Sequence, residues 1–184
     1  MEFNEKVFVR LYSILNDFLY HFYTYVELHK NFDKLKGYRE FWVFTSDAHF
    51  KMIVLSWCMI FGSYSNKTHW KELKLNRDEF LQRLLGDLHI TRKEWDEYNK
   101  KMLLFRNEFV AHRTIESIPT SPYFDLALKS VICLENWVRE QMATSTFVDN
   151  GVTVCYINDK KPLSAVISRY KKGIKYTIQP LLKK

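Results

Sequence analysis

The sequence is poor in residues that break regular structure and in patterns that bind metals or phosphates. Only 5 glycines and 4 prolines occur among 184 residues, too few for a chain of many short strands and turns. No glycine-rich phosphate loop occurs, which excludes kinase, Rossmann and P-loop proteins. The 6 histidines are scattered without an H-x3-H or H-E-x-x-H pattern, so we expect no metal and no other cofactor.

Cysteine is also scarce. Cys58, Cys133 and Cys155 are widely separated and form no C-x-x-C pair, which argues against a zinc knuckle and against a disulfide framework. Cys58 and Cys133 lie in apolar runs, where a thiol behaves as a small hydrophobic group. The cysteines therefore fit a reducing, intracellular compartment best.

Long hydrophobic runs are absent as well. The most apolar run, residues 52–62, is too short to span a bilayer. Residues 1–20 include three acidic side chains and lack the pattern of a secretory signal. We therefore expect a soluble, cytoplasmic protein with no membrane partner.

Aromatic residues, by contrast, are plentiful: 14 Phe, 11 Tyr and 5 Trp. Long runs with apolar residues three and four apart predict amphipathic helices, which we expect over residues 4–36, 38–60, 77–85, 91–111 and 122–144. Gly86 is expected to close the third helix, Thr91 and Glu94 form a capping-box signature at the start of the fourth, and Ser121-Pro122 is a start signal for the fifth. Helices of this number joined by short loops are typical of an antiparallel bundle. The predicted fold class is thus all-α, with four to five main helices in a domain of residues 1–147.

The remaining segment, residues 148–184, differs in charge. It carries eight basic and two acidic residues, so +6 of the formal net charge of +7 lies there. We predict a small basic appendage containing a short strand over 152–157 and a helix over 164–172 that ends at Gly173. Such a tail can face a polyanion; the alternative is a solvated terminus that only improves solubility.

Several chemically able side chains crowd into residues 106–113, where the predicted 91–111 helix ends. Arg106 can clamp a phosphate and His112 can transfer a proton near neutral pH. They are six residues apart and face different directions on a straight α-helix. They converge only if the helix unwinds before His112, or if two copies of the motif meet across a dimer axis. The simpler alternative is that cations are favoured at helix C-termini.

Arg106-Asn107 followed after four residues by His112 resembles the R-x4-6-H motif of the HEPN superfamily. Residues 104–113 are similar to the abortive-infection branch of that superfamily, as are Phe41-Trp42 and residues 57–62. The resemblance covers roughly residues 1–145. It implies an α-helical bundle that dimerises with its motif helices facing each other. Many members are metal-independent endoribonucleases that act as toxins or antiviral effectors, while others are non-catalytic binding modules.

The resemblance also implies roles by matching position. His112 would be the general base or acid, Arg106 the phosphate clamp and Asn107 the polar residue that positions the site. Glu108 and Arg113 lie outside the defining motif and are supporting candidates only. The expected partners are RNA, a second copy of the chain and a neutralising antitoxin or regulatory protein.

Two residues elsewhere are further candidates. His69, in the loop of residues 62–70, is a second imidazole that can approach the site, although a lone loop histidine is more often neither ligand nor catalyst. Asp47 can orient the site as a buried acid; alternatively it faces solvent together with Ser46 and Lys51.

For an RNA substrate we expect the cations of the appendage to contact the phosphate backbone. These residues are Lys160, Lys161, Arg169, Lys171, Lys172 and Lys175. The alternative function is a non-catalytic helical module that binds RNA or another protein.

Overall fold

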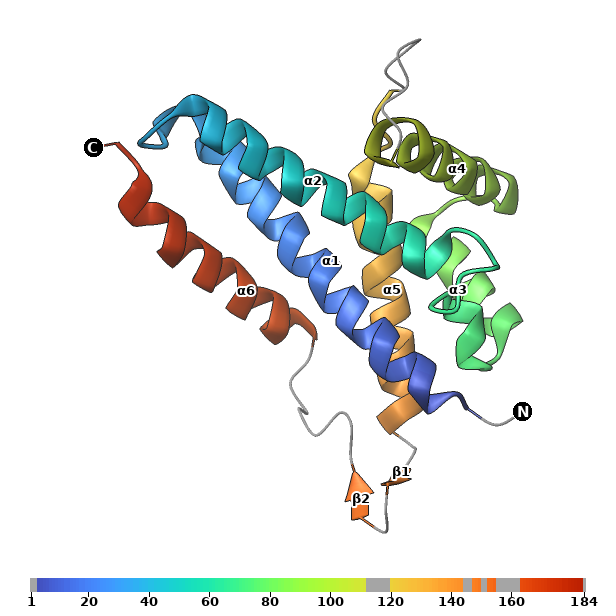
Figure 1. The fold of residues 1–184 in the computed structure, drawn as a ribbon. Helices are drawn as coiled ribbons and strands as arrows, with labels where there is room; N and C mark the ends of the chain where they lie inside the picture. The colour runs from blue at the N-terminus through green and yellow to red at the C-terminus, as the bar shows by residue number, and fades with distance from the viewer. Residues whose placement is uncertain (1–2, 112–119, 144–146, 150–151, 155–162, 184) are drawn as a thin grey trace.

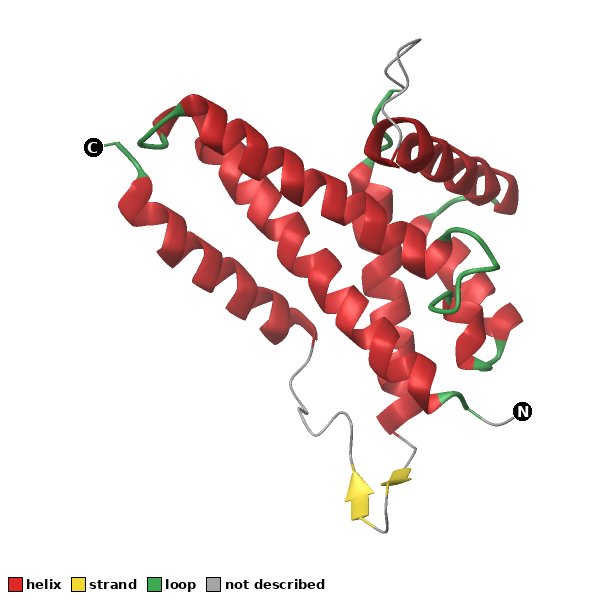
Figure 2. Cartoon of the chain, viewed as in Figure 1, coloured by secondary structure: helices red, strands yellow, loops and turns green. Residues whose placement is uncertain are grey.

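The computed structural model describes residues 3–111, 120–143, 147–149, 152–154 and 163–183. In this described part, helices make up nearly all of the structure (Figures 1 and 2). They are α1 (Glu5–Asn31), α2 (Arg39–Phe61), α3 (Arg77–Leu88), α4 (Arg92–Phe105), α5 (Phe124–Ala143) and α6 (Leu163–Ile178). The expectation of an all-α fold, consistent with a helical bundle, is confirmed for the described residues.

The two longest helices, α1 and α2, pack along each other as an antiparallel pair (Figure 1). The side chain of Asn4 caps α1 by accepting a hydrogen bond from Val7 N at 3.3 Å, as expected of an N-cap. A short 3-10 turn, Phe32–Lys34, follows α1. Gly37 then reverses the chain with a φ of +95°, a conformation that glycine adopts without steric cost.

Helices α3 and α5 close the other side of the core. Trp57 of α2 donates from Nε1 to Ser130 Oγ of α5 at 2.9 Å, and Trp137 donates from Nε1 to Glu79 Oε1 of α3 at 3.1 Å. Trp57 and Trp137 are both about 1% exposed or less. Their indole N–H groups are therefore buried with partners, as stable packing requires.

Two predicted glycine stops are wrong. Helix α3 continues through Gly86 to Leu88 and ends where His89 adopts a left-handed conformation with a φ of +53°. Helix α6 continues through Gly173 to Ile178, so the expected end of that helix is wrong too. In both cases buried apolar residues follow the glycine, and their burial outweighs its helix cost of about 1 kcal/mol. The predicted start at Ser121-Pro122 is also displaced, since α5 begins at Phe124.

Helix α6 packs against α1, in the part of the chain expected as an appendage (Figure 1). Its residues Leu163, Val166, Ile174 and Ile178 are buried and belong to the same hydrophobic cluster as the core of α1. Backbone hydrogen bonds also join the chain after α6 to the α1–α2 turn, from Lys36 N to Leu181 O at 2.8 Å and from Lys183 N to Lys34 O at 2.6 Å.

Two short strands precede α6. β1 (Phe147–Asp149) and β2 (Val152–Val154) pair antiparallel, with Phe147 opposite Val154. Residues 155–157 of the segment expected to be extended lie outside the described residues. Among the described helices, none has the length and apolar character needed to cross a lipid bilayer.

Candidate functional site

The segment that carries Arg106 and Asn107 is a π-helix rather than the expected continuation of an α-helix. Helix α4 begins with the predicted capping box, in which Glu94 N donates to Thr91 Oγ1 and Thr91 N to Glu94 Oε2. It ends at Phe105, and the chain continues as a π-helix over Arg106–Ala111. Hydrogen bonds of the i→i+5 type are rare and recur at functional sites. The local irregularity thus coincides with the motif.

An aromatic anchor fixes this π-helix to the bundle. We use this name for Phe50, Phe105, Phe109 and Phe124, which come from α2, α4, the π-helix and α5. The Phe50 ring lies 5.7 Å from that of Phe105, 6.2 Å from that of Phe109 and 5.1 Å from that of Phe124. All three contacts are edge-to-face, the arrangement that aromatic pairs favour. The anchor holds the apolar side of the motif segment inward.

On the same segment, Arg106 and Asn107 form a hydrogen-bonded pair. Asn107 Oδ1 accepts from Arg106 Nε at 3.0 Å and from Arg106 Nη2 at 2.7 Å. Asn107 is exposed and Arg106 partly buried. The pair leaves Nη1 of the guanidinium and the amide Nδ2 of Asn107 as donors, because only Oδ1 is used in the pair. Two adjacent donor groups of this kind suit an anion.

Arg106 also acts on the nearby α2. Burial raises the pKa of the Cys58 thiol to about 12, and the Arg106 charge opposes this rise. Cys58 and Cys133 are both buried free thiols, as their apolar surroundings in the sequence predict. The Arg106 charge therefore reaches the C-terminal half of α2, where the Cys58 thiol remains protonated.

The other motif residues are described only in part. Glu108 lies on the π-helix and is partly buried. His112 and Arg113 lie outside the described residues, as do Lys160 and Lys161 of the basic segment. The pairing of Arg106 with His112 therefore stays a prediction.

His69 is a buried residue with a structural role. It is 1% exposed, and its Nδ1 accepts from Lys71 N at 3.2 Å. Burial, followed by the Lys71 charge, lowers its pKa to about 4. Its ring packs between those of Tyr64 and Trp70. A neutral, buried imidazole with these contacts holds the 62–70 loop in place.

Asp47 is paired within its own helix. Its carboxylate accepts from Lys51 Nζ at 2.5 Å, and the two side chains are 32% and 24% exposed. Ser46, which we had placed on the same polar side, is instead buried. Asp47 is thus half-buried and engaged by a cation one turn away.

One pair of residues has no counterpart in the expectations from sequence. His21 of α1 and His49 of α2 lie with their Nδ1 atoms 2.7 Å apart. Burial lowers the pKa of both imidazoles. The pair joins the two central helices, close to Tyr25, whose ring contacts Phe50 of the aromatic anchor at 5.7 Å.

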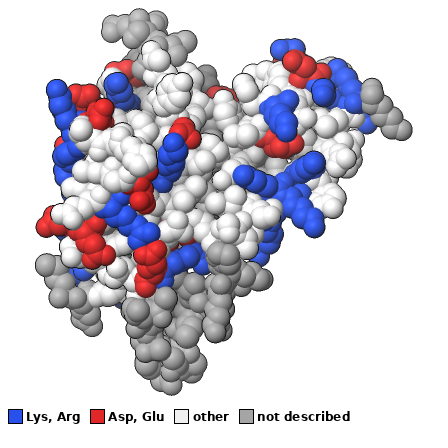
Figure 3. All heavy atoms as spheres, turned by 180° about the vertical axis from the view of Figure 1, so that it is seen from behind, with Lys and Arg blue, Asp and Glu red and all other residues white. Residues whose placement is uncertain are grey.

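The basic residues of α6 lie at the surface. Arg169, Lys171, Lys172 and Lys175 are exposed, and residues 163–184 contain no acidic residue. Lys171 Nζ lies 4.6 Å from the centre of the Tyr23 ring, so part of this charge also braces α6 against α1. In Figure 3, basic and acidic side chains are mixed on the left of the view, and a group of basic side chains lies right of centre.

Two further findings concern the chemistry and the family of this site. Among the described residues, no three His, Cys, Asp or Glu side chains are grouped so as to hold a metal ion. No protein-family model, curated protein or solved structure matches the chain. Function therefore has to be argued from the site itself.

Proposed function

We propose that the protein is a metal-independent endoribonuclease of the HEPN type, acting as a toxin or antiviral-defence effector. The observation that supports this most directly is the Arg106–Asn107 pair on an anchored π-helix. It presents a guanidinium and an amide side by side at the surface, and His112 follows Asn107 by five residues in the sequence. This donor pair is suited to a phosphodiester whose charge grows during cleavage.

The chemistry uses the 2′-hydroxyl of RNA as the nucleophile. The neutral imidazole of His112 removes the hydroxyl proton, and an imidazolium returns one to the leaving 5′-oxygen. The 2′-oxygen then bonds to phosphorus as the bond to the 5′-oxygen breaks, which gives a cyclic phosphate. Arg106 stabilises the charge on the non-bridging oxygens. DNA, which lacks the 2′-hydroxyl, resists this reaction.

A homodimer would let two motifs share these roles. Helix α2 carries exposed apolar side chains, with Phe41 60%, Phe44 72% and Met59 42% exposed, and Leu104 of α4 is 51% exposed just before the motif. Their burial by a second copy would remove apolar surface from water. In such a dimer one histidine acts as base and the other as acid.

Helix α6 supplies the complementary surface for the RNA backbone in this proposal. Arg169, Lys172 and Lys175 are exposed on a helix without acidic residues. Tyr176, 64% exposed beside them, offers a ring on which a base can stack.

The test is incubation of total RNA in chelator with the purified wild type, His112→Ala and Arg106→Ala. The control is His89→Asn, which replaces an exposed histidine by a residue that tolerates its left-handed backbone. Wild type and control should cleave RNA but not DNA. His112→Ala should be inactive, and Arg106→Ala slower by about two to three orders of magnitude.

Equal cleavage by His112→Ala and wild type, or loss of all cleavage in chelator, would contradict the proposal. The second candidate is a non-catalytic module that binds RNA or another protein, favoured by the basic α6 and the exposed apolar residues of α2. That function predicts RNA binding without cleavage in the wild type.

A further inference from the structure

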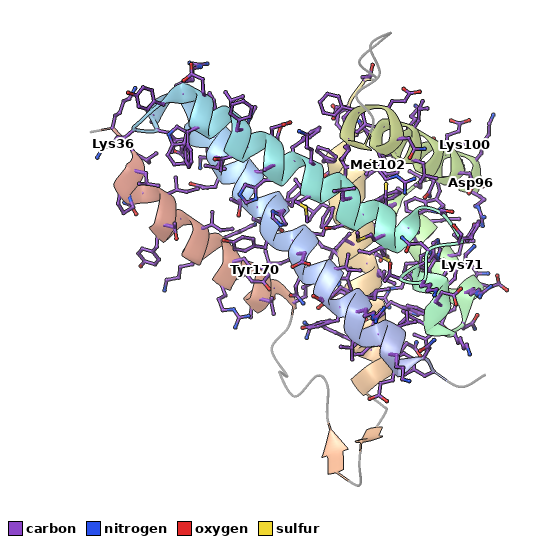
Figure 4. The ribbon with its side chains drawn as sticks, in the orientation of Figure 1. Lys36, Lys71, Asp96, Lys100, Met102 and Tyr170 are labelled. Atoms are coloured by element: carbon purple, nitrogen blue, oxygen red, sulfur yellow. The ribbon has the colours of Figure 1, made fainter. Side chains whose placement is uncertain are left out.

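A separate cleft lies along one face of α4, from Arg92 to Leu103. It has a volume of about 610 Å³, within the size range of sites that bind small molecules or parts of polymers. Its walls are the end of α2, the 62–70 loop, the 3-10 turn Trp70–Leu73, the start of α3 and one face of α4. In Figure 4, Lys71, Asp96 and Lys100 lie on this same side of the molecule.

The cleft is preformed by fixed elements. Asn66 Nδ2 and Thr68 Oγ1 both donate to Met59 O, at 3.1 and 3.0 Å, and so tie the loop to α2. At its base, the rings of Phe61 and Trp95 pack edge-to-face with centres 5.6 Å apart. A ligand would therefore find the walls already ordered, which lowers the entropy cost of binding.

The charge of the cleft is positive. Lys71, Arg77, Arg92 and Lys100 line it together with two acids, Asp78 and Asp96. The Arg92–Asp96 ion pair, at 3.0 Å, is neutral as a unit. That leaves three cations against the single charge of Asp78. His69, neutral because its pKa is lowered to about 4, adds no charge.

Two of these cations are held in position. Arg77 Nη2 donates to Lys71 O at 3.3 Å, which joins α3 to the 3-10 turn. Lys71 Nζ lies 3.6 Å from the centre of the Tyr64 ring, and Tyr64 is 64% exposed. An ammonium, a guanidinium and an aromatic ring thus stand together at the mouth of the cleft. This combination suits a phosphate joined to an aromatic base.

Asn99 adds a polar group that a ligand can use. Its Nδ2 donates to Trp95 O at 3.3 Å, while its Oδ1 is buried with no hydrogen-bond partner in the described part of the chain. A buried amide oxygen without a donor is costly. Turning the amide toward a ribose hydroxyl or a base amino group would give Oδ1 a donor in exchange for the 3.3 Å bond from Nδ2 to Trp95 O.

The cleft and the motif lie along one helix. Asn99 and Lys100, which line the cleft, each lie seven residues before a member of the Arg106–Asn107 pair. Seven residues are a rise of about 10 Å and nearly two full turns, so these residues lie on the same side of the helix. A single strand in the cleft can therefore continue to the Arg106–Asn107 pair. We infer that the cleft binds a nucleotide of the RNA strand away from the cleaved bond, with its phosphate against Lys71, Arg77 and Lys100 and its base near Tyr64. The inference rests on the proposed function for the source of this nucleotide; a free nucleotide has the same chemistry.

The test compares two double variants of equal charge. Lys71→Gln/Lys100→Gln alters the cleft, whereas Lys93→Gln/Lys101→Gln removes two exposed lysines that do not line it. The probe is a fluorescent single strand of about 12 nucleotides with every 2′-hydroxyl methylated, so that cleavage cannot interfere. Circular dichroism and thermal melting of each variant establish that it is folded.

The cleft variant should raise the Kd about tenfold relative to its control, and two lost phosphate contacts should lower the salt slope by about 1.4. Equal Kd values and slopes for the two variants would overturn the inference. A second arm titrates adenosine monophosphate. Loss of its binding in the cleft variant, with strand binding unchanged, would overturn assignment to the strand and leave a free nucleotide as the ligand.

His112→Ala separates this inference from the proposed function. It should bind the methylated strand as the wild type does, since it leaves the cleft intact. Cleft-dependent binding by a wild type that cleaves no RNA would reject the nuclease proposal but retain the binding site. If the wild type cleaves RNA but its strand binding does not depend on the cleft, the nuclease proposal is retained and the binding site is rejected.

Discussion

The Nδ1 atoms of His21 and His49 lie 2.7 Å apart across the interface between α1 and α2. A hydrogen bond at this distance needs one nitrogen that carries a proton and one that does not. The two imidazoles therefore cannot both be cations while this contact persists. Burial is the main reason that the pKa of each lies below its usual value, although Asp17 opposes the shift at His21.

This contact predicts acid sensitivity. Both pKa values are lower in the folded chain than in the unfolded chain, so the unfolded state binds protons first and stability falls as the pH falls. The loss should begin near the unfolded pKa of about 6.5 and reach up to about 1.4 kcal/mol per pH unit for each histidine. Urea unfolding between pH 7.5 and 5, roughly spanning that pKa, measures it.

The variant for this measurement is His21→Gln/His49→Gln, which should flatten the dependence on pH. A residual slope is expected from His69, whose pKa of about 4 also lies below its usual value. His89→Asn, at an exposed position, is the control and should keep the wild-type slope. A double variant as acid-sensitive as the wild type would show that the histidine pair is not responsible.

Asn107 should act by positioning Arg106 rather than by stabilising the fold. Its side chain is exposed and holds the guanidinium through two hydrogen bonds. If the proposed function is correct, Asn107→Ala should slow single-turnover RNA cleavage by about tenfold to a hundredfold, because a small misplacement of a catalytic group is costly. Thermal stability should not change. Unchanged cleavage would show that the pair is incidental.

Glycine substitutions should have opposite effects at two positions. A Cβ on Gly62 would lie 2.4 Å from the backbone oxygen of Cys58 and 3.1 Å from Leu103 Cδ2, so Gly62→Ala should cost about 1–3 kcal/mol. Gly86, within α3, has no heavy atom within 4 Å of such a Cβ. Gly86→Ala should therefore stabilise by about 0.5–1 kcal/mol. Chemical denaturation of both variants measures these shifts, and effects of the same sign would contradict the packing described.

RNA binding by α6 should depend on charge at defined positions. Truncating the chain before α6 would expose apolar core residues, so a substitution test is cleaner. Arg169→Gln/Lys172→Gln/Lys175→Gln should weaken single-strand binding and reduce the salt slope by about 0.7 per lost contact. The control, Lys67→Gln/Lys93→Gln/Lys101→Gln, removes the same charge from exposed positions outside α6. Identical binding by the two variants would leave α6 with only a structural role.

The buried thiols should be chemically inert. Burial raises the pKa of Cys58 and Cys133 to about 12, and only the thiolate reacts. In a Cys155→Ser variant, a thiol reagent should therefore give no colour with the native protein and report both thiols after denaturation. Fast reaction of the native protein would show that these sites open readily.

Local patterns were sufficient to predict the helices but not their irregularities. The apolar spacing predicted α2 closely, and Thr91 and Glu94 form the expected capping box. It also predicted the start of α1, but this helix ends at Asn31, five residues before the expected end. Gly86 and Gly173 do not end their helices, because tertiary burial of the residues that follow outweighs a local preference. A propensity-based prediction contains no such term.

The site was harder to predict because it depends on contacts between distant segments. The π-helix is braced through Phe109 by Phe50 of α2, which in turn contacts Phe124 of α5, so nothing in residues 106–111 alone indicates it. The His21–His49 contact joins residues 28 positions apart and requires the register of two helices. Arg106 and Asn107 were both named as candidates from the sequence, but the hydrogen bonds between them were not predicted.

The position of α6 also has a consequence for the order of events during synthesis. The helix that it covers, α1, ends at Asn31, and α6 begins 132 residues later, at Leu163. At about 5–20 residues per second on the ribosome, roughly 7 to 26 s separate the two. Throughout that interval the flank of α1 that will contact Val166 and Ile174 faces solvent or a chaperone. The nascent chain therefore exposes apolar surface, and is prone to aggregate, in a way that the finished protein is not.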